Sequence, residues 1–317
     1  MLLLLMAVWP SRGRAQMPDL LDISAQYIPS VELRDPKPTT TQLSSYDGTL
    51  NVPLPLGART FLVLGANYHV ESASFAHKAQ GFQEPARSFH SVEAAAMLIQ
   101  LLPNDWSITM RVAPGLAADR LAFDEDLARV SALVMATKGF SRHFVLGGGG
   151  LLSYSFGSLL PLPALYLEYK PVPALRFETF LPAFAQLLYT VAGRVEVGVR
   201  ADVSGNSYGI RDPSIAESYP CRAAEDDPST SFNEGAADPA ACFDHVAYSL
   251  VLAGAALNVR LFGDVWLSTF FGHSLYRRFD TLNAADRSTD VAGGGETLPN
   301  NWFLRCGLTW RLPSGGE

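Results

Sequence analysis

Charged side chains of both signs recur two residues apart in several stretches of the sequence. Glu168 precedes Lys170, and Arg176 precedes Glu178 in the same way. Residues spaced by two lie on the same face of a β-strand, so each stretch would present its charges to one side. Opposite charges on neighbouring strands can form ion pairs, whereas charges left unpaired around a lumen can select solutes. The candidate residues are Glu93, Arg111, Arg129, Glu168, Lys170, Arg176, Glu178, Arg194, Glu196, Arg200, Asp202, Arg305 and Arg311.

The mixture of signs on neighbouring stretches favours a lattice of ion pairs over an open ring of like charge. The tight turn at Pro171–Pro173 is expected to set Glu168 opposite Arg176. A charged constriction that selects solutes remains the second interpretation, and ionisable groups within a membrane are seldom without a role.

The histidines do not indicate a catalytic site. None of them stands beside a serine in a recognised nucleophile motif. The glycine run at 147–150 is not followed by Gly-Lys-Ser/Thr, so it does not predict a phosphate-binding loop. We therefore expect no catalytic residue, no enzyme activity and no cofactor. The histidines are His69, His77, His90, His143, His245 and His273.

Two of the three cysteines fall in the longest connection between expected strands. Export would place Cys221 and Cys242 in an oxidising compartment, where a disulfide between them is plausible. No CxxC spacing occurs, so no metal site is expected. Cys306 is expected on an apolar strand face.

The elements that must carry these side chains are strands, because hydrophobicity alternates with a period of two. From 301 to 312, one face holds Trp302, Leu304, Cys306, Leu308, Trp310 and Leu312, and the other is mostly polar or small. Tryptophans at both ends of an apolar face are typical of a strand that crosses a membrane. The stretch 194–204 alternates in the same way.

Strand length and loop length favour a transmembrane barrel. Several stretches reach the roughly 9–11 residues that a tilted membrane strand needs, and connections alternate between long and short along most of the chain. The interpretation is an all-β, antiparallel, up-and-down transmembrane β-barrel of 14 strands, or of 12 if the N-terminal pair or the pair around Pro182 is dropped. Residues 91–102 could also pass as a helix, but alternation favours a strand. The strands are expected near 19–29, 42–53, 58–69, 89–101, 106–116, 128–137, 144–156, 163–170, 174–181, 185–191, 194–204, 245–258, 265–276 and 301–312.

The N-terminus reads as a secretory signal peptide. Leu2–Trp9 is an apolar stretch of the right length, and Gly13-Arg14-Ala15 is a small-x-small cleavage pattern. Residues 1–15 are therefore expected to be the signal peptide and 16–317 one barrel domain. Charged residues make up 17% and the net charge is −7, so no basic surface for nucleic acid is expected. The one long uncharged stretch, 144–167, contains four glycines in a row and two prolines, which disfavours a membrane helix.

The order of turn and strand motifs from Trp106 to Lys170 resembles that of an uncharacterised family of Gram-negative outer-membrane β-barrels. This family is one of the domain-of-unknown-function groups frequent in myxobacteria and their relatives. The similar features are Ala113-Pro114-Gly115, Lys138-Gly139-Phe140-Ser141, the glycine-rich strand, and Pro161-Leu162-Pro163. The resemblance extends loosely over 16–312. It implies a fold and the outer membrane as compartment, and it carries no catalytic or ligand residues.

Together these observations predict an exported integral outer-membrane barrel that is a small-solute channel or transporter, or a structural barrel with an ion-paired lumen. The alternatives are an outer-membrane enzyme that modifies lipid and a soluble periplasmic β-sandwich that binds a ligand. The expected partners are the lipid bilayer, lipopolysaccharide and the outer-membrane insertion machinery.

Overall fold

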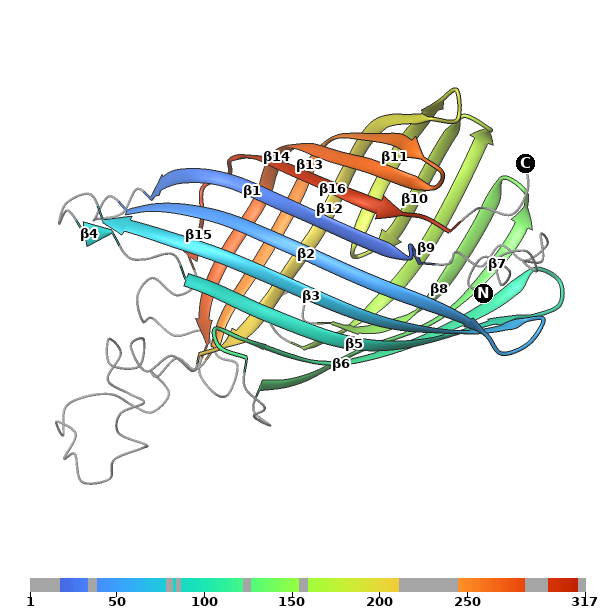
Figure 1. Cartoon of the computed structure of the whole chain (residues 1–317), viewed down its shortest axis with the longest axis horizontal. Coiled ribbons are helices and arrows are strands. Elements are labelled where there is room, and N and C mark those ends of the chain that lie inside the picture. The colour runs from blue at the N-terminus through green and yellow to red at the C-terminus, as the bar shows by residue number, and fades with distance from the viewer. Residues whose placement is uncertain are drawn as a thin grey trace.

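A computed structural model describes residues 18–33, 39–77, 82–83, 87–121, 127–153, 159–210, 245–282 and 296–312. Within these ranges the chain folds into long antiparallel strands that wrap around one lumen (Figure 1). The long strands are β1 (Leu21–Leu33), β2 (Thr39–Pro55), β3 (Thr60–His77), β5 (Arg87–Leu101), β6 (Trp106–Ala118), β7 (Ala128–Ser141), β8 (Phe144–Ser153), β9 (Leu160–Val172), β10 (Leu175–Leu181), β11 (Phe184–Val191), β12 (Val195–Gly209), β13 (His245–Phe262), β14 (Val265–Leu282) and β16 (Trp302–Trp310). Two short strands, β4 (Phe82–Gln83) and β15 (Glu296–Thr297), pair with β3 and β14.

The sheet closes on itself. Each long strand pairs with the next long strand along the chain, and the last, β16, pairs with β1 through the register Leu21↔Trp310 to Tyr27↔Leu304. Closure pairs every long strand on both sides, which removes the free edges that an open sheet would present. In the described part of the chain the barrel has 14 long strands, so the 14-strand prediction is confirmed and the 12-strand and sandwich alternatives are wrong.

The two ends of the barrel differ in their connections. At one end, here called the short-turn end, turns such as 102–105 and 263–264 are brief, and β1 begins there beside the end of β16. The opposite end, the long-loop end, carries connections such as 210–244, most of which lies outside the described residues. This asymmetry is the one expected of outer-membrane barrels.

Side chains alternate between the lumen and the outside as the sequence predicts. On β16, Trp302, Leu304 and Leu308 are exposed on the outer face, whereas Phe303 is fully buried inside. Exposed aromatic residues form two bands. Trp302 and Trp310, one in each band, are eight residues apart, which is about 20 Å along the axis of a tilted strand. The band near the short-turn end is Trp106, Phe140, Tyr169, Tyr189, Phe262 and Trp310, and the other is Tyr27, Tyr46, Tyr68, Phe271 and Trp302.

Residues 91–102, the stretch that could have passed as a helix, belong to β5 except for the last residue. Within the described ranges, no helix is long and apolar enough to cross a membrane.

The glycine run of β8 provides close contact between strands. A Cβ on Gly149 would lie 2.0 Å from the carbonyl oxygen of Val134 on β7, and one on Gly147 would lie 2.5 Å from Thr137 Cγ2. Neither position has room for a side chain, so these glycines allow β7 and β8 to approach closely.

The strands of the barrel wall are shortest at the β10–β11 hairpin. These two strands have seven and eight residues, whereas their neighbours β9 and β12 have 13 and 15. β12 continues past the top of β11, where Phe184 pairs with Asp202, and its last residue pairs with Ala118 of β6. The Asp119 amide also donates to the Gly209 carbonyl oxygen at 3.1 Å, so β12 reaches β6 at the long-loop end.

An apolar cluster fills the lumen beside this contact. We call it the plug. Phe89 and Tyr208 meet with ring centroids 5.2 Å apart, and Phe270 packs edge-on against Phe303 at 4.6 Å. The plug therefore occupies the long-loop half of the lumen between β12–β14 and β1–β6. Its residues are Ile28, Leu43, Ala73, Phe89, Ala117, Tyr208, Ile210, Val246, Tyr248, Leu250, Leu252, Phe270 and Phe303.

Candidate functional site: a polar cavity in the lumen

A cavity of about 450 Å³ lies in the lumen on the short-turn side of the plug. Its lining runs from Asp19 and Arg311 at that end to Phe270, which also belongs to the plug. Four arginines and three carboxylates line it, together with amide and hydroxyl groups. The full lining is Asp19, Asp22, Ser24, Arg176, Glu178, Phe184, Gln186, Leu188, Arg200, Ala256, Asn258, Ser268, Thr269, Phe270, Arg305, Gly307, Thr309 and Arg311.

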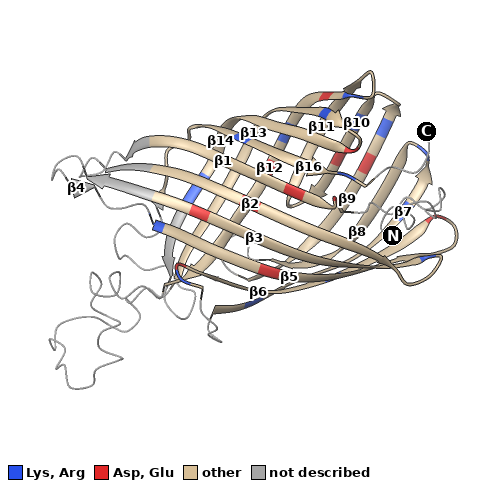
Figure 2. Ribbon diagram, in the orientation of Figure 1, with Lys and Arg blue, Asp and Glu red and all other residues tan. Residues whose placement is uncertain are grey.

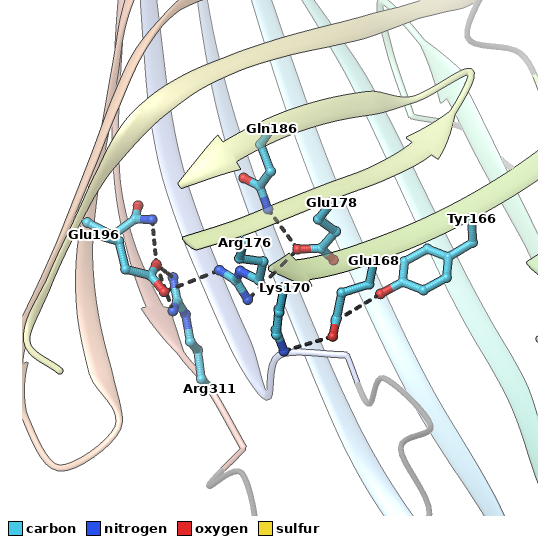
Figure 3. A network of polar contacts seen from close by, with 9 residues as sticks. Tyr166, Glu168, Lys170, Arg176, Glu178, Gln186, Glu196 and Arg311 are labelled. Carbon is cyan, nitrogen blue, oxygen red and sulfur yellow. Dashed lines mark hydrogen bonds and ion pairs between the residues drawn. The ribbon is translucent and has the colours of Figure 1, made fainter. Parts of the chain in front are cut away.

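Glu196 of β12 is the centre of the first ion-pair network of this cavity (Figure 3). Arg176 donates to its Oε1 at 3.2 Å, and both terminal nitrogens of Arg311 donate to its Oε2 at 3.1 Å. Asn258 of β13 adds a fourth hydrogen bond at 2.9 Å. This buried carboxylate therefore joins three separate strands and the residue that follows β16.

Arg176 does not pair with Glu168, so that prediction is wrong. Between the pairs Leu175↔Val172 and Phe177↔Tyr169, β9 has one more residue than β10, and this register shift places Glu168 opposite Glu178 instead. Glu168 pairs with Lys170 at 2.7 Å, while Arg176 approaches Glu178 at 3.8 Å as well as Glu196 (Figure 3).

Asp202 is the centre of a second network, deeper in the lumen. Arg200 donates to it through Nε at 2.6 Å, and Arg305 of β16 donates through a terminal nitrogen at 2.7 Å. The remaining nitrogens of Arg305 donate to the Gln26 side chain of β1 at 3.0 and 2.6 Å. Two guanidinium groups thus share one carboxylate.

Aromatic rings hold three of these guanidinium groups. The Arg200 Cζ lies 5.5 Å from the ring centre of Phe184 and 5.9 Å from that of Phe270. Arg305 lies 5.7 Å from Phe270, and Arg311 lies 4.2 Å from Trp266. Distances of this size allow cation–π attraction, which fixes the side chains beyond their ion pairs.

The remaining predicted charges lie elsewhere. Arg111 pairs with Glu93 at 3.4 Å on the opposite part of the wall, and Arg129 donates to Asn206 beneath the long-loop end. The prediction that Arg194 faces the lumen is wrong. Arg194 is exposed in the turn at residues 192–194, because the β11–β12 hairpin turn ends one residue later than expected. Figure 2 marks the charged positions on all of these strands.

Sequence reasoning missed the acidic residues at the entrance of the cavity. Asp22 accepts a hydrogen bond from Thr309 at 2.7 Å, and Asp19 lies just before β1. Burial raises the pKa of Asp19 to about 6, while nearby Arg311 opposes this rise and Asp22 adds to it. The alternation Asp22, Ser24, Gln26 on β1 is a signal that could have identified the polar face.

Sequence reasoning also missed polar groups at the edge of the plug. Tyr208 donates to the buried Glu71 carboxylate at 3.3 Å, and His69 contacts Asp47 at 2.5 Å. Arg277 is fully buried and donates to the Pro299 carbonyl oxygen at 3.1 Å. Tyr208 belongs to the plug, so its hydrogen bond to Glu71 joins the plug to β3.

The cysteine predictions are tested only in part. Cys221 and Cys242 lie outside the described residues, and Cys306 is a free, exposed cysteine on the outer face of β16. No group of His, Cys, Asp and Glu among the described residues is arranged to hold a metal ion.

Several solved structures are similar to this chain. The COG4313 outer membrane channel from Pseudomonas putida F1 has a TM-score of 0.44 and 11% identity, with 95% of this chain and 98% of that chain covered. The beta domain of the Bordetella autotransporter BrkA has a TM-score of 0.34 and 8% identity, with 93% and 100% covered. The translocator domain of the autotransporter NalP from Neisseria meningitidis has a TM-score of 0.34 and 9% identity, with 94% and 90% covered. Similarities this distant say nothing about what the barrel carries.

No curated protein matches the sequence. A family model described as a domain of unknown function, DUF6268, matches residues 11–220, which is more than half of the chain. The expectation of an uncharacterised family is therefore met, while its frequency in myxobacteria stays a prediction. The chain belongs to the DUF6268 family of unknown function.

Proposed function

We propose that this protein is an outer-membrane channel for small polar solutes, and that the plug holds it closed in the conformation described here. The observation that carries the proposal is the polar cavity of about 450 Å³. It lies inside a closed wall whose outer face is apolar and bounded by two aromatic bands.

The outer face supports a place in a bilayer. Val199, Val134 and Leu64 are exposed between the bands, and a soluble protein would not leave so much apolar surface around its whole circumference. The closed ring satisfies the backbone groups that a membrane would leave without water. Together with the expected signal peptide, this surface favours the outer membrane.

The cavity supports solute passage over a purely structural role. A structural barrel gains most from an apolar, close-packed interior, since buried ion pairs add little net stability. Here the short-turn half of the lumen retains space between the paired arginines. The plug, by contrast, contains fully buried Phe303 and Leu252.

Conductance across planar bilayers tests the proposal. The refolded full chain is expected to show small or infrequent openings. Replacing Phe89 and Phe303 with Ala is expected to increase the open probability or the unit conductance, because both rings belong to the plug. A matched control is Phe262→Ala, which removes an exposed ring at the short-turn end and should leave conductance unchanged.

Heat-modifiable mobility on gels confirms folding of each variant before recording. Silent bilayers for both the folded wild type and the folded plug variant would overturn the channel and favour the structural barrel. Turnover of outer-membrane lipid by the same preparation would instead favour an enzyme.

A further inference from the structure

Arg200 retains hydrogen-bonding capacity in the cavity that it lines. Its Nε donates to Asp202 at 2.6 Å, and its remaining contacts are with two rings. Among the described residues, no side chain or carbonyl group accepts a hydrogen bond from its two terminal nitrogens. A guanidinium group presents its donors as a planar fork, which fits the two oxygens of a carboxylate.

The rings of Phe184 and Phe270 hold that fork in place. They lie 5.5 and 5.9 Å from the Arg200 Cζ and come from different parts of the wall, β11 and β14. Both rings also line the cavity. The guanidinium is therefore oriented before any ligand arrives, which reduces the entropy lost on binding.

The charge around Arg200 is unbalanced. Arg200 and Arg305 share the single carboxylate of Asp202, so this network carries one positive charge in excess. The network around Glu196 differs, because Glu178 lies 3.8 Å from Arg176 and supplies a second carboxylate for two guanidinium groups. The excess positive charge is thus located at the deep end of the cavity.

We propose that the deep end of this cavity binds the carboxylate of a small organic acid on the terminal nitrogens of Arg200. The apolar part of the acid lies against Phe184, Phe270 and Leu188, which line the same space. The volume fits a molecule of drug-like size or smaller. This inference rests on the proposed channel function and names its class of solute.

Binding to the folded, detergent-solubilised full chain tests the site without any need for transport. Benzoate is the probe, and isothermal titration calorimetry measures its affinity. Three compounds are compared with benzoate. Benzyl alcohol has the ring without a charge, benzylamine has the ring with a positive charge, and inorganic phosphate is an anion without a ring. Benzoate is expected to bind at least tenfold more tightly than each of the three.

Two substitutions test the role of Arg200. Arg200→Met is expected to weaken benzoate binding at least tenfold, and Arg200→Lys to an intermediate degree, because an ammonium group keeps the charge but loses the fork. Arg111→Met is the matched control, since Arg111 does not line the cavity, and its affinity should equal that of the wild type. Gel mobility and the urea midpoint show that each variant is folded.

Equal affinity for benzoate and benzyl alcohol would overturn the proposal in favour of an apolar pocket. Equal affinity for benzoate and phosphate would overturn it in favour of a general anion site, and full benzoate binding by folded Arg200→Met would refute the assignment of Arg200. Benzoate binding that depends on Arg200 in a barrel that never conducts would support the site and refute only the channel. Conductance without benzoate binding would refute the site alone.

Discussion

Replacement of Glu196 by Gln is the most direct test of the ion-pair network. The carboxylate accepts four hydrogen bonds, three of them from Arg176 and Arg311, and is almost fully buried. Removing one partner of a buried ion pair costs about 3–5 kcal/mol, because the other charge is left uncompensated. The two guanidinium groups are each 25% exposed and can be solvated in part, so the expected loss is about 2–3 kcal/mol.

Glu93→Gln is the matched control on the opposite part of the wall. Its single contact with Arg111 is 3.4 Å long, and both side chains are about one-third exposed. A pair of this kind contributes less than about 1 kcal/mol. Both substitutions remove one negative charge and keep the shape of the side chain, so their difference reports the environment of the carboxylate.

Urea unfolding of the chain refolded in lipid vesicles, followed by tryptophan fluorescence, measures both losses. The Glu196 variant is expected to lose at least about 1 kcal/mol more than the Glu93 variant. Equal losses would refute the reasoning, because the shared carboxylate would then be no more important than a solvated pair. The double variant Glu196→Gln with Arg311→Gln should recover part of the loss, since it also removes one uncompensated charge.

Three further predictions concern the entrance, the outer face and the revised pairing. The Asp19 pKa of about 6 lies above its ordinary value of 3.8, so the stability that Asp19 itself contributes is complete below about pH 4 and declines by no more than about 3 kcal/mol as the pH rises through 6. Relative to the wild type, Asp19→Asn should remove this decline in urea midpoints measured at pH 4 and 7.5, and the same pH profile for both proteins would contradict the burial argument. Val199 faces lipid between the bands, so Val199→Arg should lower the free energy of unfolding by about 2–4 kcal/mol, measured by urea unfolding in vesicles. Phe262→Arg at the interface should lower it by only about 0–1 kcal/mol, and equal losses would argue against this position of the membrane. Glu168→Ala should lower stability by about 1–2 kcal/mol, because it frees partly exposed Lys170 and removes the acceptor of the hydrogen bond from buried Tyr166. A larger loss would mean that Glu168 supports more than these two contacts.

Most of the barrel could be predicted from the sequence because its signals are local. Alternation along 301–312 places Trp302 and Trp310 on the outer face, and the structure confirms that placement. The period of two also predicts which charges face the lumen, since a side chain cannot change faces without a bulge. Arg194 was the exception because the prediction placed the end of a turn one residue too early.

Pairing across strands could not be predicted in the same way. The register shift beside Arg176 depends on how β10 fits against β9. Pro171 lies in the unpaired part of β9 and cannot donate to the ladder, but a proline alone does not say which residue of the next strand loses its partner. Partners such as Glu196 and Arg311 are 115 residues apart in the sequence. They meet only because β12 and the end of β16 line the same side of the lumen.

The plug and the cavity also follow from closure of the whole sheet. Phe89 and Tyr208 are aromatic residues on inward strand faces. A sequence pattern assigns them to a lumen but does not say whether they meet across it. The contact between them depends on β12 reaching β6. The cavity is then the space that the plug does not fill.

That junction of β12 with β6 gives the barrel two hydrogen-bonded hoops of unequal size. The hoop at the short-turn end passes through all 14 long strands, while at Gly209 and Ala118 a smaller hoop closes through β12, β13, β14, β16, β1, β2, β3, β5 and β6. Strands β7–β11 lie outside the smaller hoop, so at the level of Gly209 and Ala118 the lumen is enclosed by nine strands, whereas 14 strands enclose it at the short-turn end.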